Sequence, residues 1–172
     1  MNRRLSQYGF TLIELLVVIT VLAILASITT AGVISAMRNS KIRAVKARMM
    51  LIERSADSYQ LDHRDFPSDG GGMSSPVESS ASLFDALMNG QGRSAPYMSD
   101  DIKTELIDGK RALIDEWKSP IAYRHPRSYS RQSPKSTGIR LYSAGPDMDF
   151  ETDGDNIVNW DTASYPDTRR KP

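Results

Sequence analysis

The stretch with the strongest metal-binding chemistry is SAGPDMDFETDGDNIVNW, residues 143–160. Five carboxylates fall within nine positions of it, at Asp147, Asp149, Glu151, Asp153 and Asp155. Carboxylates at this density repel one another unless water or a hard cation neutralises them. Calcium takes about six to eight oxygen ligands from carboxylates, carbonyls and waters. The pattern is therefore typical of either a solvated surface loop or a calcium site.

The spacing of these acids only partly matches an EF-hand calcium loop. Counted from Asp149, the acids together with Gly154 fit the first seven positions of such a loop. The twelfth position is Trp160, where an EF-hand has a bidentate glutamate, and no helix is predicted to follow. The sequence therefore argues against a true EF-hand.

A second chemical candidate is Glu14, the only charge in the apolar stretch FTLIELLVVITVLAILASITTAGVISAM, residues 10–37. About 20 apolar residues suffice to cross the hydrocarbon core of a bilayer. An ionised carboxylate in hydrocarbon is costly and usually persists only with a partner. Two interpretations are open: Glu14 pairs with the amino group of a neighbouring chain, or it lies near the end of the segment and reaches headgroup water.

Composition excludes most other site chemistry. The 172 residues include 22 basic and 21 acidic side chains, and the formal net charge of +1 does not favour a nucleic-acid partner. The absence of cysteine excludes disulfides, thiolate zinc sites and iron–sulfur clusters. The two histidines, His63 and His125, lack the partners and spacing of a catalytic site. The basic stretch 124–138 is interpreted as a solvated hairpin loop, and no nucleic-acid binding is expected.

One long helix is predicted to carry the apolar stretch and to continue beyond it, since no proline lies between Phe10 and Phe66. Past residue 38, apolar residues recur at spacings of three and four, which places one apolar stripe on a helix. The stripe comprises Ile42, Val45, Met49, Ile52, Ala56 and Tyr59. It is too short for a sustained coiled coil, so it is expected to pack against the chain's own C-terminal domain.

The C-terminal part is predicted to be a small α+β head. Asp65-Phe66-Pro67 is expected to end the long helix, and the Pro/Gly/Ser-rich residues 67–82 to form an irregular loop. Ser82 is a candidate cap for a short helix at 83–89. A strand or turn between residues 102 and 114, and half-buried strands at 121–124 and 139–143, predict a small antiparallel sheet.

The N-terminus resembles that of type IV prepilins and type II secretion pseudopilins over GFTLIELLVVITVLAILA, from Gly9 to Ala26. The resemblance implies that a prepilin peptidase cuts between Gly9 and Phe10 and methylates the new N-terminus at Phe10. It further implies that Glu14 recognises the N-terminal amine of a neighbouring subunit during assembly.

Further residues resemble the major pseudopilins of type II secretion. These are Tyr59-Gln60-Leu61-Asp62 with Phe66-Pro67, Asp115-Glu116-Trp117-Lys118-Ser119-Pro120 with Tyr123, and Asn159-Trp160 after the acidic loop. The resemblance implies a structural calcium ion (Ca²⁺) in that loop. The candidate ligands are Asp147, Asp149, Asp153, Asp155 and Asn156.

Taken together, these residues predict an α+β, pilin-like ladle: a long N-terminal helix packed on a small antiparallel β-sheet head. The expected parts are a leader at 1–9, a transmembrane assembly helix at 10–37, its amphipathic half at 38–66, and a head at 67–172. The resemblance implies a non-enzymatic pseudopilin of a type II secretion system. Its expected partners are further copies in a filament, other pseudopilins, the prepilin peptidase and the inner-membrane secretion platform.

Alternatives concern the filament type, the anchor and the topology. A type IV pilus subunit would have the same N-terminus, and a secreted calcium-dependent domain would use residues 10–37 only as a signal or anchor. Counting positive charges puts the C-terminal side in the cytoplasm, because more basic residues follow the apolar stretch than precede it. The resemblance implies the reverse, a single-pass inner-membrane protein with its head in the periplasm, and this orientation is the one predicted.

Overall fold

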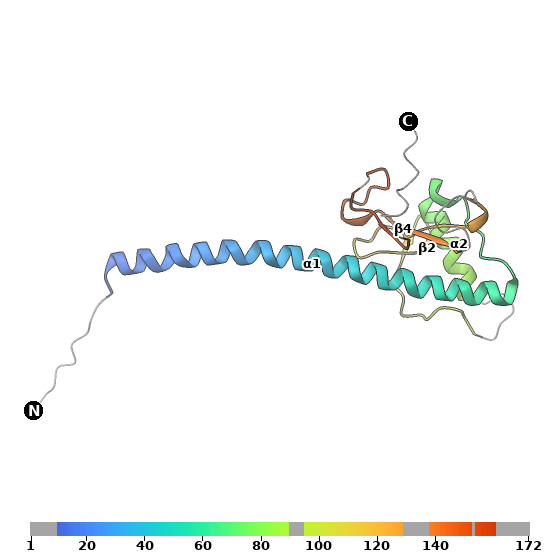
Figure 1. Cartoon of the computed structure of the whole chain (residues 1–172), viewed down its shortest axis with the longest axis horizontal. Coiled ribbons are helices and arrows are strands. Elements are labelled where there is room, and N and C mark those ends of the chain that lie inside the picture. The colour runs from blue at the N-terminus through green and yellow to red at the C-terminus, as the bar shows by residue number, and fades with distance from the viewer. Residues whose placement is uncertain (1–9, 90–94, 129–137, 153, 161–172) are drawn as a thin grey trace, which may run out of the picture. The chain divides into compact units, whose positions relative to one another are not determined.

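The computed structural model describes residues 10–89, 95–128, 138–152 and 154–160 (Figure 1). The chain divides into two compact units, Met1–Ser40 and Lys41–Pro172. The elements, with η for a 3-10 turn, are α1 (Leu12–His63), η1 (Gly72–Ser74), α2 (Pro76–Met88), β1 (Thr104–Ile107), β2 (Lys110–Leu113), β3 (Ala122–Arg124), η3 (Pro126–Ser128), β4 (Arg140–Ser143), η4 (Gly145–Asp147) and β5 (Ile157–Val158).

The first unit contains the apolar beginning of α1. Large apolar side chains occur on all its faces, and those that the structure describes from Leu12 to Met37 range from 47% to 83% exposed. A helix that is apolar all round is buried in a large core or spans a membrane. By length and composition, α1 is sufficient to cross a membrane once.

The second unit begins with the amphipathic part of α1, and the predicted stripe is confirmed. Val45, Met49, Ile52 and Ala56 are at most 1% exposed. They join one core cluster with apolar side chains of α2, β2, β3 and β4, including Leu83, Leu87, Leu113, Tyr123 and Leu141. The amphipathic part of α1 therefore packs on its own head, as its short stripe predicted.

The end of α1 lies close to the predicted position. The helix stops at His63, and Arg64 adopts a left-handed conformation with φ +60°. Phe66 is then buried in the core, and the Tyr123 hydroxyl donates to the Pro67 carbonyl at 2.6 Å. The predicted stop at residues 65–67 is thus a buried connection that follows directly on the helix.

The predicted loop over residues 67–82 is wrong in its second half, because α2 begins at Pro76. Proline suits the first turn of a helix, where its fixed φ is helical and its missing N–H has no intrahelical partner. Ser82 does not cap a helix at 83–89. It lies inside α2, and its hydroxyl donates to the Ser68 carbonyl at 2.9 Å.

The serines that indicated a loop are buried between α2 and the strands. The Ser80 hydroxyl donates to the Leu113 carbonyl at 3.0 Å, and the Ser79 hydroxyl accepts from the Tyr123 N–H at 3.1 Å. Both serines are fully buried. Their small side chains let α2 pack directly on β2 and β3, with which it makes many contacts.

In the described part of the head, two small antiparallel sheets complete the fold, which confirms the α+β class. β1 and β2 form a hairpin whose turn residues, Asp108 and Gly109, have φ of +51° and +77°, as a two-residue hairpin turn requires. β3, β4 and β5 form the second sheet in that order. The prediction of half-buried strands is wrong for both β3 and β4, because all four residues of β4 are buried and so are Ala122 and Tyr123 of β3.

Candidate functional site

The N-terminus of α1 carries a reciprocal hydrogen-bond pair between Thr11 and Glu14. The backbone N–H and the hydroxyl of Thr11 donate to Glu14 Oε2 at 2.9 and 2.8 Å. The Thr11 hydroxyl accepts from the Glu14 N–H at 3.3 Å. This is a capping box, in which an N-cap threonine and a glutamate three residues later satisfy donors that the first turn leaves unpaired.

Glu14 therefore lies in the first turn of α1, where the helix dipole favours a carboxylate. Phe10, the predicted first residue of the processed chain, is 82% exposed. Gly9 lies outside the described residues. Thr11 was missed at the sequence level, although Thr-x-x-Glu before an apolar run is the signature of a capping box.

The acidic stretch folds into successive tight turns after β4. Asp147 Oδ1 accepts from the Asp149 N–H at 3.0 Å, and Asp149 Oδ1 accepts from the Glu151 N–H at 2.8 Å. The Thr152 hydroxyl donates to the other Asp147 oxygen. The hydrogen bonds from Thr152 and the Asp149 N–H hold the pKa of Asp147 below its ordinary value. The loop thus keeps an ionised carboxylate at neutral pH.

The two ends of this loop cross at Gly145. A Cβ at this position would lie 2.3 Å from the Asp155 carbonyl oxygen, and φ is +76°. Glycine is required both by the close approach and by the left-handed backbone. The crossing brings together Asp147 and Asp155, and the Asp147 N–H donates to Asp155 Oδ2 at 3.3 Å.

Asn156 follows this crossing and has a buried carbonyl oxygen. Its Nδ2 donates to the Tyr142 hydroxyl at 3.0 Å and to the Thr152 carbonyl. Its Oδ1 is buried and accepts no hydrogen bond from the residues described. Since Thr152 also bonds Asp147, the amide lies in the same loop network as that carboxylate.

The structure groups only some of the predicted metal ligands. Asp147 and Asp155 lie together, and Asn156 shares Thr152 as a neighbour with Asp147. Asp149 uses one oxygen for the next turn, and Asp153 lies outside the described residues. Across the described ranges, no three His, Asp or Glu side chains converge closely enough to hold a metal ion.

A buried aspartate supports the start of the acidic loop. Asp115 is 1% exposed, and its Oδ1 accepts from the N–H groups of Trp117 and Ser119 at 2.8 and 2.9 Å. Its Oδ2 accepts from the Ser143 hydroxyl at 2.7 Å, and that hydroxyl accepts from the Gly145 N–H at 3.2 Å. The turn after β2 therefore holds the end of β4 and the glycine crossing in place.

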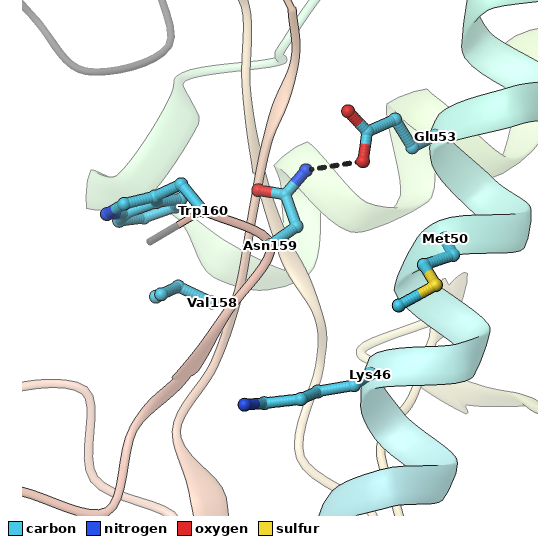
Figure 2. A pocket seen from close by; sticks show the side chains of 6 residues that line it. All are labelled: Lys46, Met50, Glu53, Val158, Asn159 and Trp160. Atoms are coloured by element: carbon cyan, nitrogen blue, oxygen red, sulfur yellow. Dashed lines mark hydrogen bonds between the residues drawn. The ribbon is translucent and has the colours of Figure 1, made fainter. Parts of the chain in front are cut away.

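Asn159 ties the far end of the loop to β4 and α1. Its Oδ1 accepts from the Leu141 N–H at 3.0 Å, and its Nδ2 donates to the Ile139 carbonyl at 3.1 Å. The same Nδ2 donates to Glu53 Oε2 of α1 at 3.2 Å. Both residues line a cavity of about 230 Å³ (Figure 2). Asn159 had been used only as a mark of resemblance, and its bonding role was missed.

The chain is similar to known proteins over most of its length. Residues 4–30 match the family model of the prokaryotic N-terminal methylation motif. The chain is 31% identical over 163 residues to the type II secretion system core protein G of Pseudomonas aeruginosa, covering 94% of this chain and 99% of that protein. It is 27% identical over 155 residues to the Escherichia coli (strain K12) protein of the same name, covering 90% and 92%.

A solved structure also matches part of the chain. It is the crystal structure of the major pseudopilin from the type 2 secretion system of enterohaemorrhagic Escherichia coli, with a TM-score of 0.41 and 23% identity over 73% of this chain and 87% of that chain. The full-length match to the Pseudomonas aeruginosa protein extends from the apolar helix through the acidic loop. The chain therefore belongs to the family of type II secretion system core protein G.

Proposed function

We propose that this protein is a pseudopilin, a structural subunit that assembles through α1 into a short filament of a type II secretion system. The observation that carries the proposal is the full-length match to a core protein G, together with an apolar helix whose first turns lie within the methylation motif. Its partners are further copies of the chain and the other pseudopilins. The role is structural, and we propose no enzymatic activity.

Processing gives the chain its assembly-competent end. A prepilin peptidase cuts between Gly9 and Phe10 and methylates the Phe10 amine, which leaves Glu14 four residues from the new N-terminus. The amine of one subunit then approaches the Glu14 carboxylate of the next within the apolar layer. Both charges are otherwise costly there, so the pairing favours subunits stacked along their helices.

The apolar part of α1 anchors the subunit in the inner membrane as a single span, with the head on the periplasmic side. The secretion platform in that membrane is the proposed site of assembly. This orientation places residues 1–9 where a cytoplasmic-facing peptidase reaches them. It also sets the amphipathic half of α1 in water, where its charged faces are stable.

The experiment that tests this function is mass spectrometry of the chain purified from cells that carry the secretion system. We expect an N-terminus at Phe10 with one added methyl group. Sheared filaments containing this processed form should sediment from the same cells. A chain that begins near Gly32 would instead indicate an ordinary secreted domain and would overturn the proposal.

The acidic loop is proposed to hold one structural calcium ion through Asp147, Asp155 and Asn156. The support is the chemistry of the donors: two adjacent carboxylates and a buried amide oxygen that no described donor satisfies. Such hard oxygen donors suit calcium. The ion would neutralise the paired acids and fasten a C-terminal region that has no disulfide.

Calcium binding is tested by thermal unfolding of the full chain in detergent. Calcium at about 100 times its Kd should stabilise the head by about 2.7 kcal/mol, and a chelator should reverse this. Asp155→Asn should abolish the calcium response, whereas Glu151→Gln, a change to an exposed acid of the same loop, should preserve it. An identical melting curve with calcium and with chelator would contradict calcium binding but would not affect the proposed filament role.

A further inference from the structure

A groove runs along α1 in the second unit, on a face next to the buried stripe. Its floor is apolar and formed mainly by Ala44, Ala47 and Leu51 of α1 and by Met98 and Ile102 of the segment before β1. The cavity volume is about 560 Å³. Leu51 is 57% exposed, whereas its neighbour Ile52 on the stripe is fully buried. The groove is thus large enough for a loop tip and has an apolar surface to cover.

The rim of this groove is positively charged. Arg48, Arg54 and Lys103 line it, against a single acid of the lining, Asp101. Arg48 and Lys103 both pair with one carboxylate, Glu116. Three cations therefore face two carboxylates, and the exposed Arg54 lies beside the exposed Leu51. A partner that fits must carry an apolar tip with negative charge around it.

The chain itself carries such a tip in the acidic loop. Met148 is 60% exposed and has φ of +60°, between Asp147 and Asp149. The carboxylate of each flanking aspartate accepts a backbone N–H two residues later, which fixes the turn. No lysine or arginine occurs between residues 141 and 160. The loop is therefore a pre-formed methionine knob with acidic flanks, which binds at a low entropic cost.

We infer that the acidic loop tip of one subunit, Asp147-Met148-Asp149, docks into the α1 groove of a second copy in the filament. Met148 covers the floor at Leu51, and Asp149 approaches Arg54. This inference rests on the proposed filament. Because the groove and the loop are different surfaces of one chain, the contact is heterologous and repeats along an open filament.

The small area expected for this contact means that it forms only between subunits already held together in the filament. A loop tip in a groove buries far less than the roughly 1,600 Å² of a stable interface. Isolated heads should therefore not associate through it. Subunits whose helices are already stacked have a high effective concentration of heads, so a small complementary contact is then sufficient to fix their register.

Engineered cysteines test this docking directly, because the chain has none of its own. The full chain carrying Ser99→Cys at the groove and Met148→Cys at the knob is expressed with its secretion system and oxidised in membranes. We expect a ladder that includes trimers and longer species, whereas the single variants can form disulfide dimers at most. The matched control pairs Met148→Cys with Leu61→Cys, at an 81% exposed α1 residue outside the groove lining, and should give no ladder.

Charge reversal at the groove tests whether the acidic loop is what binds there. Arg54→Glu should lower the ladder yield roughly fivefold, whereas Arg54→Lys, which keeps the positive charge, should preserve it. If no ladder forms although processed wild-type filaments still sediment, the docking is contradicted but the pseudopilin role is not. An equal ladder from the Leu61→Cys control, or a yield unaffected by Arg54→Glu, also overturns it. If wild-type filaments and Phe10 processing are both absent, the proposed function fails and the docking with it.

Discussion

The part of α1 up to Met37 and the part from Ile42 to His63 belong to one helix, yet their apolar residues are arranged differently. In the first part, apolar side chains occupy every face, and the large ones that the structure describes are at least 47% exposed. In the second, Val45, Met49, Ile52 and Ala56 form a stripe that the head covers, while Leu51 and Leu61 lie outside it and are exposed. The first part therefore depends on an apolar environment outside the chain, while the second is stabilised by the chain's own core.

The comparison also separates assembly from folding. A polar change in the first part should affect how subunits meet and leave the head unchanged. A change in the second part or in the head should alter the free energy of unfolding of the head itself. The first prediction below concerns the first part of α1, and the others concern the second part and the head.

The largest effect is expected from Glu14→Ala, which should lower filament yield at least about tenfold because the partner for the N-terminal amine is lost. The measurement is sedimentation of sheared filaments, with leader removal checked by mass spectrometry. The melting temperature of the head should not change. A shifted head melting temperature, or normal filaments, would contradict the separation of the two regions.

Gly145→Ala should destabilise the head by about 4 kcal/mol, because the added methyl group meets the Asp155 carbonyl and the backbone is left-handed. Chemical denaturation of the full chain in detergent measures this effect. The matched control is Gly109→Ala, with a similar φ of +77° but no atom within 4 Å of the new Cβ. That control should lose only about 1 kcal/mol, from backbone strain alone.

Ile52→Ala and Leu51→Ala test the stripe with adjacent residues of α1. Ile52 is fully buried, so its truncation should cost about 3 kcal/mol in the free energy of unfolding. Leu51 is 57% exposed and should lose at most about 0.5 kcal/mol. Equal losses for the two variants would mean that the stripe does not carry the packing of α1 on the head.

The smallest effect concerns Glu116, which binds Lys103 and Arg48. Hydrogen bonds from Lys103 and then Arg48 hold the pKa of Glu116 below its ordinary value of 4.5. A depressed pKa contributes stability that is fully present above pH 4.5 and is lost as the pH falls below it. Glu116→Gln should therefore lower stability by about 1 kcal/mol at pH 7.

Unfolding of wild type and Glu116→Gln across the pH range provides the check. The difference between the two proteins should shrink as the pH falls below 4.5. A difference that stays constant with pH would assign the effect to packing rather than to charge.

Local patterns were enough to predict α1, β3 and β4, whereas the region of β1 and β2 was expected only as a strand or turn and β5 was not predicted. Val45, Met49 and Ile52 are spaced four and three residues apart, so periodicity alone predicts that they share one face of the helix. The first turns of α2 were not predictable in this way. Ser79 and Ser80 have strand partners 44 and 33 residues away, and these contacts turn a serine-rich stretch into a packed helix.

The candidate sites likewise include some that local sequence patterns predict and some that depend on contacts between distant residues. Glu14 and the acidic loop were found because charge is unusual in an apolar run and dense in a short loop. The bonds of Asn159 were not predictable, since its partners Leu141 and Glu53 lie 18 and 106 residues earlier. The buried Asn156 oxygen likewise depends on how the loop closes around Gly145.

The amide of Asn159 has a consequence for the ageing of the protein. β5 has only two residues, so this one side chain supplies much of the bonding at the end of the described chain. Hydrolysis of the amide would replace a donor N–H by a negative oxygen facing Glu53. Deamidation would thus release this end of the head without any mutation, and it would be seen as an acidic species whose Leu141 amide exchanges with solvent faster.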